Sequence, residues 1–294
     1  MSKQLIINKY NIDNYNLDVM IKATNIIFFD LDESFDFSKY THITHLHFGY
    51  NFNQPVNNLP SNITHLTFGE CFNKTIDNLP SNIILLTFSY KFNQPVNNLP
   101  SNITHLTFGY DFNQPVNNLP SNITHLTFGD CFNKTIDNLP PNITHLTFGW
   151  HFNQPIDNLP QSITYLSFGF NFNQPVDNLP PNITHLTFGE CFNKTIDNLP
   201  SNIILLTFSY KFNQPVDNLP QIITHLTLGH NFNKTIDNLP NTLIEINFRT
   251  SKYYENYNIN MLPDNIQIIK CKSYNTNLKN KILLSRHKDK LKIE

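Results

Sequence analysis

The stretch Phe112–Gly129 reads FNQPVNNLPSNITHLTFG, and close copies of it fill most of the chain. Ten copies follow one another at a constant step of 20 residues, without an insertion. A fixed period of this length is typical of a solenoid or another repeat array. Each copy begins with the phenylalanine of one set: Phe52, Phe72, Phe92, Phe112, Phe132, Phe152, Phe172, Phe192, Phe212 and Phe232.

Equivalent positions 20 residues apart form a column, which we name after its member between 52 and 71. Proline is present in column 60 of all ten copies and in column 55 of six. Because proline cannot donate to a sheet, the strand must lie in the proline-poor part of the repeat. There Leu66, Thr67 and Phe68 alternate between apolar and polar, as strand residues do. We therefore predict a strand at 65–69 and a mainly β solenoid with one parallel sheet and 20-residue turns.

The two ends of the chain depart from the repeat, as terminal caps of solenoids do. We predict an N-terminal cap over 1–41, with a strand at 25–30 and a short helix near 14–22. The repeat array covers 42–250. We expect 251–294 to contain one degenerate repeat at 262–269 and a basic, helical C-terminal cap, with the helix at 276–291 and Leu278, Ile282, Leu283 and Leu291 partly buried.

The spacing of the cysteines and the lack of a signal peptide indicate an intracellular protein in a reducing compartment. This compartment is the host cytoplasm if the chain is viral. Cys71, Cys131 and Cys191 lie three repeats apart, about 14 Å at the usual strand spacing, which is too far for disulfides. We find no signal peptide and no apolar run long enough to span a membrane. Only 14% of the residues are charged, and residues 270–294 hold eight basic and two acidic side chains.

Two columns are asparagine in every copy, and we predict that both form structural ladders. An amide stacked on its equivalent can bond the backbone of the neighbouring turn, where no strand satisfies these groups. The predicted ladder residues include Asn53, Asn58, Asn113, Asn118, Asn133 and Asn138.

The open face of the sheet is the candidate binding surface, since Leu66 and Phe68 should point inward while His65, Thr67 and Gly69 point outward. Column 65 holds seven histidines, but no carboxylate or thiolate accompanies them, so we expect no metal site. Column 70 carries aromatic residues of the kind that dominate protein interfaces. The candidate partner-binding residues are His65, Leu85, Tyr90, His105, Tyr110, His125, His145, Trp150, Tyr165, Phe170, His185 and Tyr210.

Catalysis is not indicated. Serine is sparse in the array, and no nucleophile is combined with a base. The repeat cysteines follow Glu70, Asp130 and Glu190, and an adjacent acid raises the pKa of a thiol. The sequence also contains no glycine-rich phosphate loop, so we expect no cofactor.

The repeat resembles two known patterns. Ile123, Leu126 and Phe128, followed by Phe132-Asn133, resemble the leucine-rich repeat signature. The motifs FNQPI and LPxxIxxLxFG, copied almost without change over 42–250, resemble the FNIP repeat family more closely. This resemblance implies a leucine-rich-repeat-like, right-handed coil with an extended convex side, found in amoebae and in the giant viruses that infect them.

The resemblance also implies a protein-interaction role. Our expectation is a monomeric, non-enzymatic scaffold that binds a protein partner, of the host if viral, and no membrane. Some family members carry an F-box that recruits a ubiquitin ligase, which leaves a substrate adaptor as one alternative. A second alternative is binding of a carbohydrate through the aromatic row, or of a nucleic acid through the basic tail, although nucleic acid is disfavoured because the tail lacks interleaved aromatics.

Overall fold

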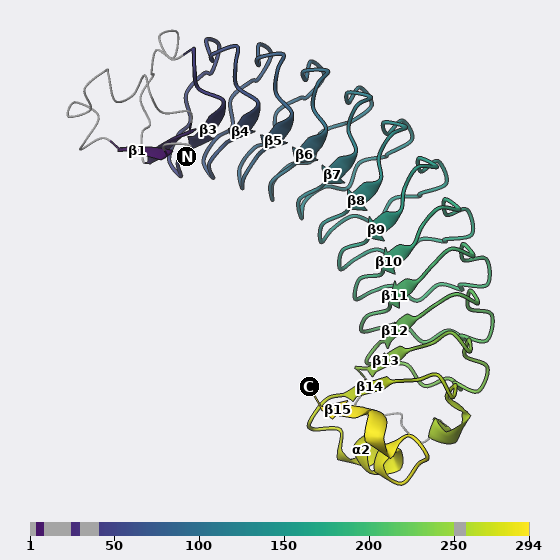
Figure 1. Ribbon diagram of the computed structural model, residues 1–294. Helices are drawn as coiled ribbons and strands as arrows, with labels where there is room; N and C mark the ends of the chain where they lie inside the picture. The colour runs from purple at the N-terminus through teal and green to yellow at the C-terminus, as the bar shows by residue number, and fades with distance from the viewer. Residues whose placement is uncertain (1–3, 9–24, 30–40, 250–256, 294) are drawn as a thin grey trace. The chain divides into compact units, whose positions relative to one another are not determined.

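A computed structural model describes residues 4–8, 25–29, 41–249 and 257–293 of the chain. The chain forms two compact units, Met1–Thr144 and His145–Glu294. Each unit is a coil whose successive turns stack through short parallel strands (Figure 1). None of the helices within the described ranges is long and apolar enough to cross a membrane.

In the first unit, seven strands pair in chain order, each parallel to the next. The register joins equivalent positions, so Leu66 lies between Leu46 and Leu86. Every turn therefore places identical side chains over one another. The strands are β1 (Gln4–Asn8), β2 (Asn25–Phe29), β3 (His45–Phe48), β4 (His65–Thr67), β5 (Leu85–Thr87), β6 (His105–Thr107) and β7 (His125–Thr127).

The second unit continues the same pattern and adds a cap. Its strands also pair in parallel and in chain order. They are β8 (His145–Thr147), β9 (Tyr165–Ser167), β10 (His185–Thr187), β11 (Leu205–Thr207), β12 (His225–Leu228), β13 (Glu245–Phe248), β14 (Ile268–Cys271) and β15 (Leu291–Ile293). The helical segments are the 3₁₀ turns η4 (Ile259–Met261) and η5 (Lys288–Lys290) and the helix α2 (Thr276–Leu283).

The parallel sheet and the 20-residue turn confirm the predicted fold class, but the repeat strand is shorter than predicted. It ends at Thr67 instead of Gly69. The Phe68 N–H still donates to the carbonyl of Thr87, at 2.9 Å. The chain then turns, because the Gly69 carbonyl accepts a hydrogen bond from the Phe72 N–H at 3.3 Å.

Two columns of phenylalanine form the core of the coil. Within one turn, the rings of Phe68 and Phe72 stack with centroids 3.9 Å apart. Between turns, Phe68 stacks on Phe88 at 5.4 Å and Phe72 on Phe92 at 6.0 Å. All four rings are fully or almost fully buried. The rings thus form a double stack within each unit, interrupted in the second unit by the buried Leu228, and this stack removes a large apolar area from water.

The glycine of column 69 does not face the open side of the sheet, so that part of the prediction is wrong. A Cβ atom added to Gly69 would lie 1.9 Å from the carbonyl oxygen of Gly49, and one added to Gly129 would lie 1.8 Å from that of Gly109. The position faces the backbone of the preceding turn. At Gly69 and Gly129 a side chain on the present backbone would overlap a carbonyl of the preceding turn, so glycine allows the close approach there, whereas Ser89 and Ser209 occupy the same column in two other turns.

The C-terminal end differs from the prediction in its helix. The strand predicted at 25–30 is confirmed by β2, and β14 begins at the end of the predicted degenerate repeat and pairs with β13. The helix, however, ends at Leu283, and residues 291–293 form β15, which adds a strand to the sheet. Leu278 and Ile282 are buried, but Leu283 is 46% exposed. The helix predicted near 14–22 lies outside the described residues.

Tyr257 closes the phenylalanine stack. Its ring contacts Phe232 and Phe248, and its hydroxyl donates to the carbonyl of Phe232 at 2.6 Å. Tyr257 is 1% exposed. A tyrosine can terminate the apolar column because its hydroxyl finds a backbone acceptor there.

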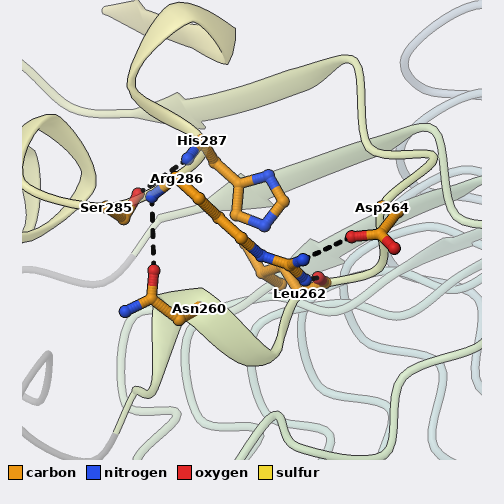
Figure 2. A network of polar contacts seen from close by, with 6 residues as sticks. All are labelled: Asn260, Leu262, Asp264, Ser285, Arg286 and His287. Carbon is orange, nitrogen blue, oxygen red and sulfur yellow. Dashed lines mark hydrogen bonds and ion pairs between the residues drawn. The ribbon is translucent and has the colours of Figure 1, made fainter.

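Arg286 connects the end of the cap to the degenerate repeat (Figure 2). Its guanidinium pairs with Asp264 at 2.5 Å and donates to the Leu262 carbonyl at 2.8 Å. Its backbone N–H donates to Asn260 Oδ1 at 3.3 Å. The adjacent His287 is buried, and burial, followed by the charge of Arg286, lowers the pKa of its imidazole. The cap is therefore built around a neutral histidine beside a paired arginine.

The glycine column gives a stability prediction. Replacing Gly129 with alanine should lower the free energy of unfolding by about 2–3 kcal/mol, because the new methyl group overlaps the Gly109 carbonyl and forces the turns apart. Chemical denaturation measures this change. Ser89 already carries a Cβ atom in the same column, so Ser89→Ala is the control and should change stability by only about 0.5 kcal/mol. Equal losses in both variants would contradict the close-approach explanation.

Candidate functional site

The sheet face presents histidines whose orientation is set by neighbouring threonines. In strand β4, His65 and Thr67 are half-buried while Leu66 is fully buried, so alternate side chains reach the surface. The Nδ1 atom of His65 lies 2.9 Å from the hydroxyl of Thr64. That hydroxyl also lies 3.1 Å from the carbonyl of Thr44. If the hydroxyl donates to this carbonyl, then Nδ1–H donates to the hydroxyl and Nε2 remains an acceptor.

Several histidines are stacked in pairs. The rings of His45 and His65 lie 4.1 Å apart, and those of His105 and His125 lie 4.2 Å apart. Leu85 separates these two pairs along the column. The pKa of His65 is lowered, first by desolvation and then by the nearby His45 and His105. In the second unit, His145 stacks on Tyr165 at 5.7 Å.

The histidines do not form a metal centre with other ligands in the described part of the chain. No group of three His, Cys, Asp or Glu side chains there is close enough to hold an ion. The stacked rings of His45 and His65 are parallel to within 11°, and those of His105 and His125 to within 12°. The column is thus a row of hydrogen-bonding imidazoles on a surface.

The aromatic residues of column 70 form separate stacked pairs, whereas the sequence suggested one row. Tyr90 stacks on Tyr110 at 4.7 Å with an interplanar angle of 2°, and Trp150 stacks on Phe170 at 4.2 Å with the same angle. Tyr90 is 45% and Trp150 47% exposed. Tyr210 forms a further pair with His230 at 4.8 Å. Each pair is a flat, rigid, partly apolar surface.

An acidic residue precedes each pair by one repeat, and this period of three repeats was the signal that the sequence prediction missed. The acids are Glu70, Asp130 and Glu190. The carboxylate of Glu190 accepts hydrogen bonds from the Ser209 hydroxyl at 3.0 Å and from the Tyr210 N–H at 3.1 Å. In this case the acid fixes the turn that carries the ring.

The repeat cysteines follow column 70, which carries the aromatic pairs, by one residue. Cys71, Cys131 and Cys191 are free and half-buried. Desolvation, followed by the charges of Asp111 and Asp130, raises the pKa of the Cys131 thiol. The thiol therefore stays protonated near neutral pH and is a poor nucleophile.

The asparagines of column 53 link successive turns. The Oδ1 atom of Asn53 accepts the backbone N–H of Asn73 at 2.9 Å, and Asn113 accepts that of Asn133 at 3.0 Å. Where glutamine follows, its side chain joins the ladder, as Gln114 does with Asn93 at 3.1 Å. Each amide thus holds the next turn at a place where no strand is present.

The other asparagine columns make different bonds. Column 58 is exposed, and its amides reach an aspartate of the preceding turn, as Asn178 does with Asp157 at 3.3 Å. Column 62, which the sequence analysis did not single out, donates regularly to a carbonyl 21 residues earlier, as Asn82 does to Ser61 at 2.9 Å. Its near-constant asparagine was the available signal.

Comparison with known proteins supports the family assignment. The FNIP Repeat family matches residues 41–71, 72–111, 92–131, 112–149, 132–171, 152–191, 172–211 and 212–251. The chain belongs to the FNIP repeat family. This confirms the predicted resemblance and its leucine-rich-repeat-like fold.

One solved structure of an LRR protein agrees with this assignment. The crystal structure described as CroV588, a novel circular LRR protein, has a TM-score of 0.77 and 40% identity to the FNIP chain. The match covers 85% of our chain but only 40% of that protein. YopM from Yersinia enterocolitica WA-314 also matches, with a TM-score of 0.38 and 17% identity over 78% of our chain and 64% of its own. Comparison with curated protein sequences gives no match.

The histidine column should make the FNIP array less stable in acid. Because the pKa of His65 is lowered in the folded chain, the unfolded chain binds more protons as the pH falls through about 6.5. The contribution of His65 to stability is thus complete above this pH and is lost below it. We expect the midpoint of thermal unfolding to fall between about pH 7.5 and 5.5, and the fall to be smaller in His65→Leu. A midpoint that does not change over this range would contradict the prediction.

The asparagines of column 53 should contribute more to the free energy of unfolding than those of column 58. Asn113→Ala removes the acceptor of the Asn133 N–H and should lower the free energy of unfolding by about 1 kcal/mol, the usual net contribution of one hydrogen bond. Asn118→Ala, five residues along the same turn, removes an exposed amide and should cost less than about 0.5 kcal/mol. Urea denaturation compares the two, and equal losses would show that the inter-turn bond is not the cause.

Proposed function

We propose that this chain is a non-enzymatic scaffold that binds a protein partner through the stacked aromatic pairs of column 70 and the adjoining sheet face. The exposed ring pairs carry the proposal. Tyrosine and tryptophan are enriched among the residues that dominate binding energy. Tyr90, Trp150 and Tyr210 are each about half exposed, so their rings are available to a partner.

The geometry of the pairs favours binding at a low entropic cost. The rings of Tyr90 and Tyr110 are parallel to within 2°, as are those of Trp150 and Phe170. A side chain already held by a neighbour loses little rotamer freedom when a partner covers it. The histidines and threonines of the sheet face then supply hydrogen bonds around the rings.

The family supports the same role. Leucine-rich-repeat-like solenoids present extended surfaces that bind other proteins. FNIP repeats are found in amoebae and in the giant viruses that infect them. If the chain is viral, the expected partner is therefore a protein of the host. The raised pKa of Cys131 is a further argument against thiol catalysis at this surface.

Removal of one ring pair tests the proposal. The immobilised full chain would capture partners from an amoeba lysate, and the affinity of each purified partner would be measured by calorimetry. Trp150→Ala/Phe170→Ala should weaken binding by roughly 30-fold or more, the effect of losing a binding hot spot. Leu284→Ala is the control, because Leu284 is 89% exposed but lies in the cap, away from column 70.

Two results would contradict the proposal. One is a partner that the double variant and the wild-type chain bind with equal affinity. The other is a loss of binding in Leu284→Ala as large as that in the double variant, since this would place the interface on the cap.

A further inference from the structure

A groove in the first unit runs along the coil beside the entry to strands β3–β7, apart from the aromatic pairs. One wall is the asparagine column from Asn62 to Asn142, and the other is column 64 from Thr44 to Thr124 with Ile84 in its centre. Its volume is about 860 Å³. This size is within the range of sites that enclose organic ligands.

The asparagines are held in place by the coil and still offer hydrogen bonds. The amide of Asn102 donates one N–H to the Ser81 carbonyl at 2.9 Å, and Asn122 does the same to Ser101. A carboxamide has a second N–H and an oxygen with two lone pairs. Each turn therefore presents a fixed donor and a fixed acceptor to the groove.

The opposite wall adds hydroxyl groups and one apolar step. The hydroxyl of Thr124 lies 3.2 Å from the Thr104 carbonyl and 2.9 Å from His125 Nδ1, which fixes the oxygen. Ile84 is 42% exposed and provides a hydrocarbon surface between the threonines. A ligand in the groove thus meets amides on one side, and hydroxyls and a methyl surface on the other.

Charge and spacing narrow the choice of ligand. All the lining residues are uncharged, so the groove lacks the cations that a phosphate polymer requires. The amides repeat with the strand spacing of about 4.8 Å. Side chains on one face of an extended peptide repeat at roughly 6.6 Å, so they would lose register with the amides within two turns. An extended chain of β-1,4-linked pyranose rings advances by close to one strand spacing per ring and carries hydroxyls on both edges.

We propose that this groove binds a neutral linear polysaccharide, with one sugar ring per turn of the coil. The sugar hydroxyls would hydrogen-bond to the asparagine amides and threonine hydroxyls, and a ring face would pack on Ile84. The site belongs to the first unit, because Ser162 and Ile222 interrupt the same asparagine column in the second.

Calorimetric titration of the full chain with neutral hexasaccharides tests the proposal. Suitable probes are the β-1,4-linked cellohexaose, chitohexaose, mannohexaose and xylohexaose, with hexagalacturonate as the charged control. At least one neutral probe should bind and the charged one should not. For the probe that binds, affinity should rise from the disaccharide to about the pentamer, one ring for each turn that carries an amide, and then level off.

Two matched variants localise the binding. Asn102→Leu removes the amide in the middle of the groove and should weaken binding by roughly tenfold. Asn202→Leu removes the equivalent amide of the second unit, which donates to the Pro181 carbonyl at 3.0 Å, and should leave the affinity unchanged. The two variants lose the same bond to the backbone, so a difference between them reports on the ligand.

Three results would overturn this assignment. The first is that none of the four neutral probes binds at concentrations up to about 1 mM. The second is equal affinity in Asn102→Leu and Asn202→Leu. The third is loss of sugar binding in Trp150→Ala/Phe170→Ala, which would transfer the sugar to the aromatic pairs. Sugar binding that persists in this double variant separates the groove from the proposed protein-binding surface.

Discussion

The stacking of each turn directly on its neighbour is the constraint on which the rest of the structure depends. Parallel strands lie about 4.8 Å apart, so each turn must offer the next one a surface of nearly identical shape. The double phenylalanine stack satisfies this condition in the core. The glycines of column 69 satisfy it at the edge, where the backbone of one turn contacts the next without a side chain between them. A turn with another length or other core residues would interrupt both the phenylalanine stack and the backbone contacts at column 69.

Polar side chains make this stacking possible outside the sheet. Most repeat strands contain three residues, which leaves much of each turn without a backbone ladder. Asparagine and threonine side chains replace that ladder. The amides of column 53 accept an N–H from the next turn, and those of column 62 donate to a carbonyl of the preceding one. These bonds join successive turns where no strand does, and column 53 is asparagine in all ten copies while the surface positions change.

The two proposed binding surfaces use different parts of this framework. The aromatic pairs occupy the most variable column, which suits the choice of a particular partner. The groove uses nearly constant asparagines and threonines, and its uniform spacing suits a ligand that is itself a repeat. Both surfaces are rigid because the coil that positions them is tied together turn by turn. The FNIP repeat thus combines nearly constant core and asparagine columns with a small number of variable surface positions.

The sequence by itself determined the period, the parallel sheet, the buried columns of Ile63, Leu66 and Phe68, and the asparagine column that links the turns. These follow from local alternation and exact repetition, which survive in any arrangement of the chain. Only the tertiary structure decided which way Gly69 faces, that the column 70 rings pair, and that columns 62 and 64 enclose a groove. It also decided that the cap ends in a strand at 291–293. These features depend on the distance between neighbouring turns and on backbone angles outside the strand, and neither is contained in an alternating pattern.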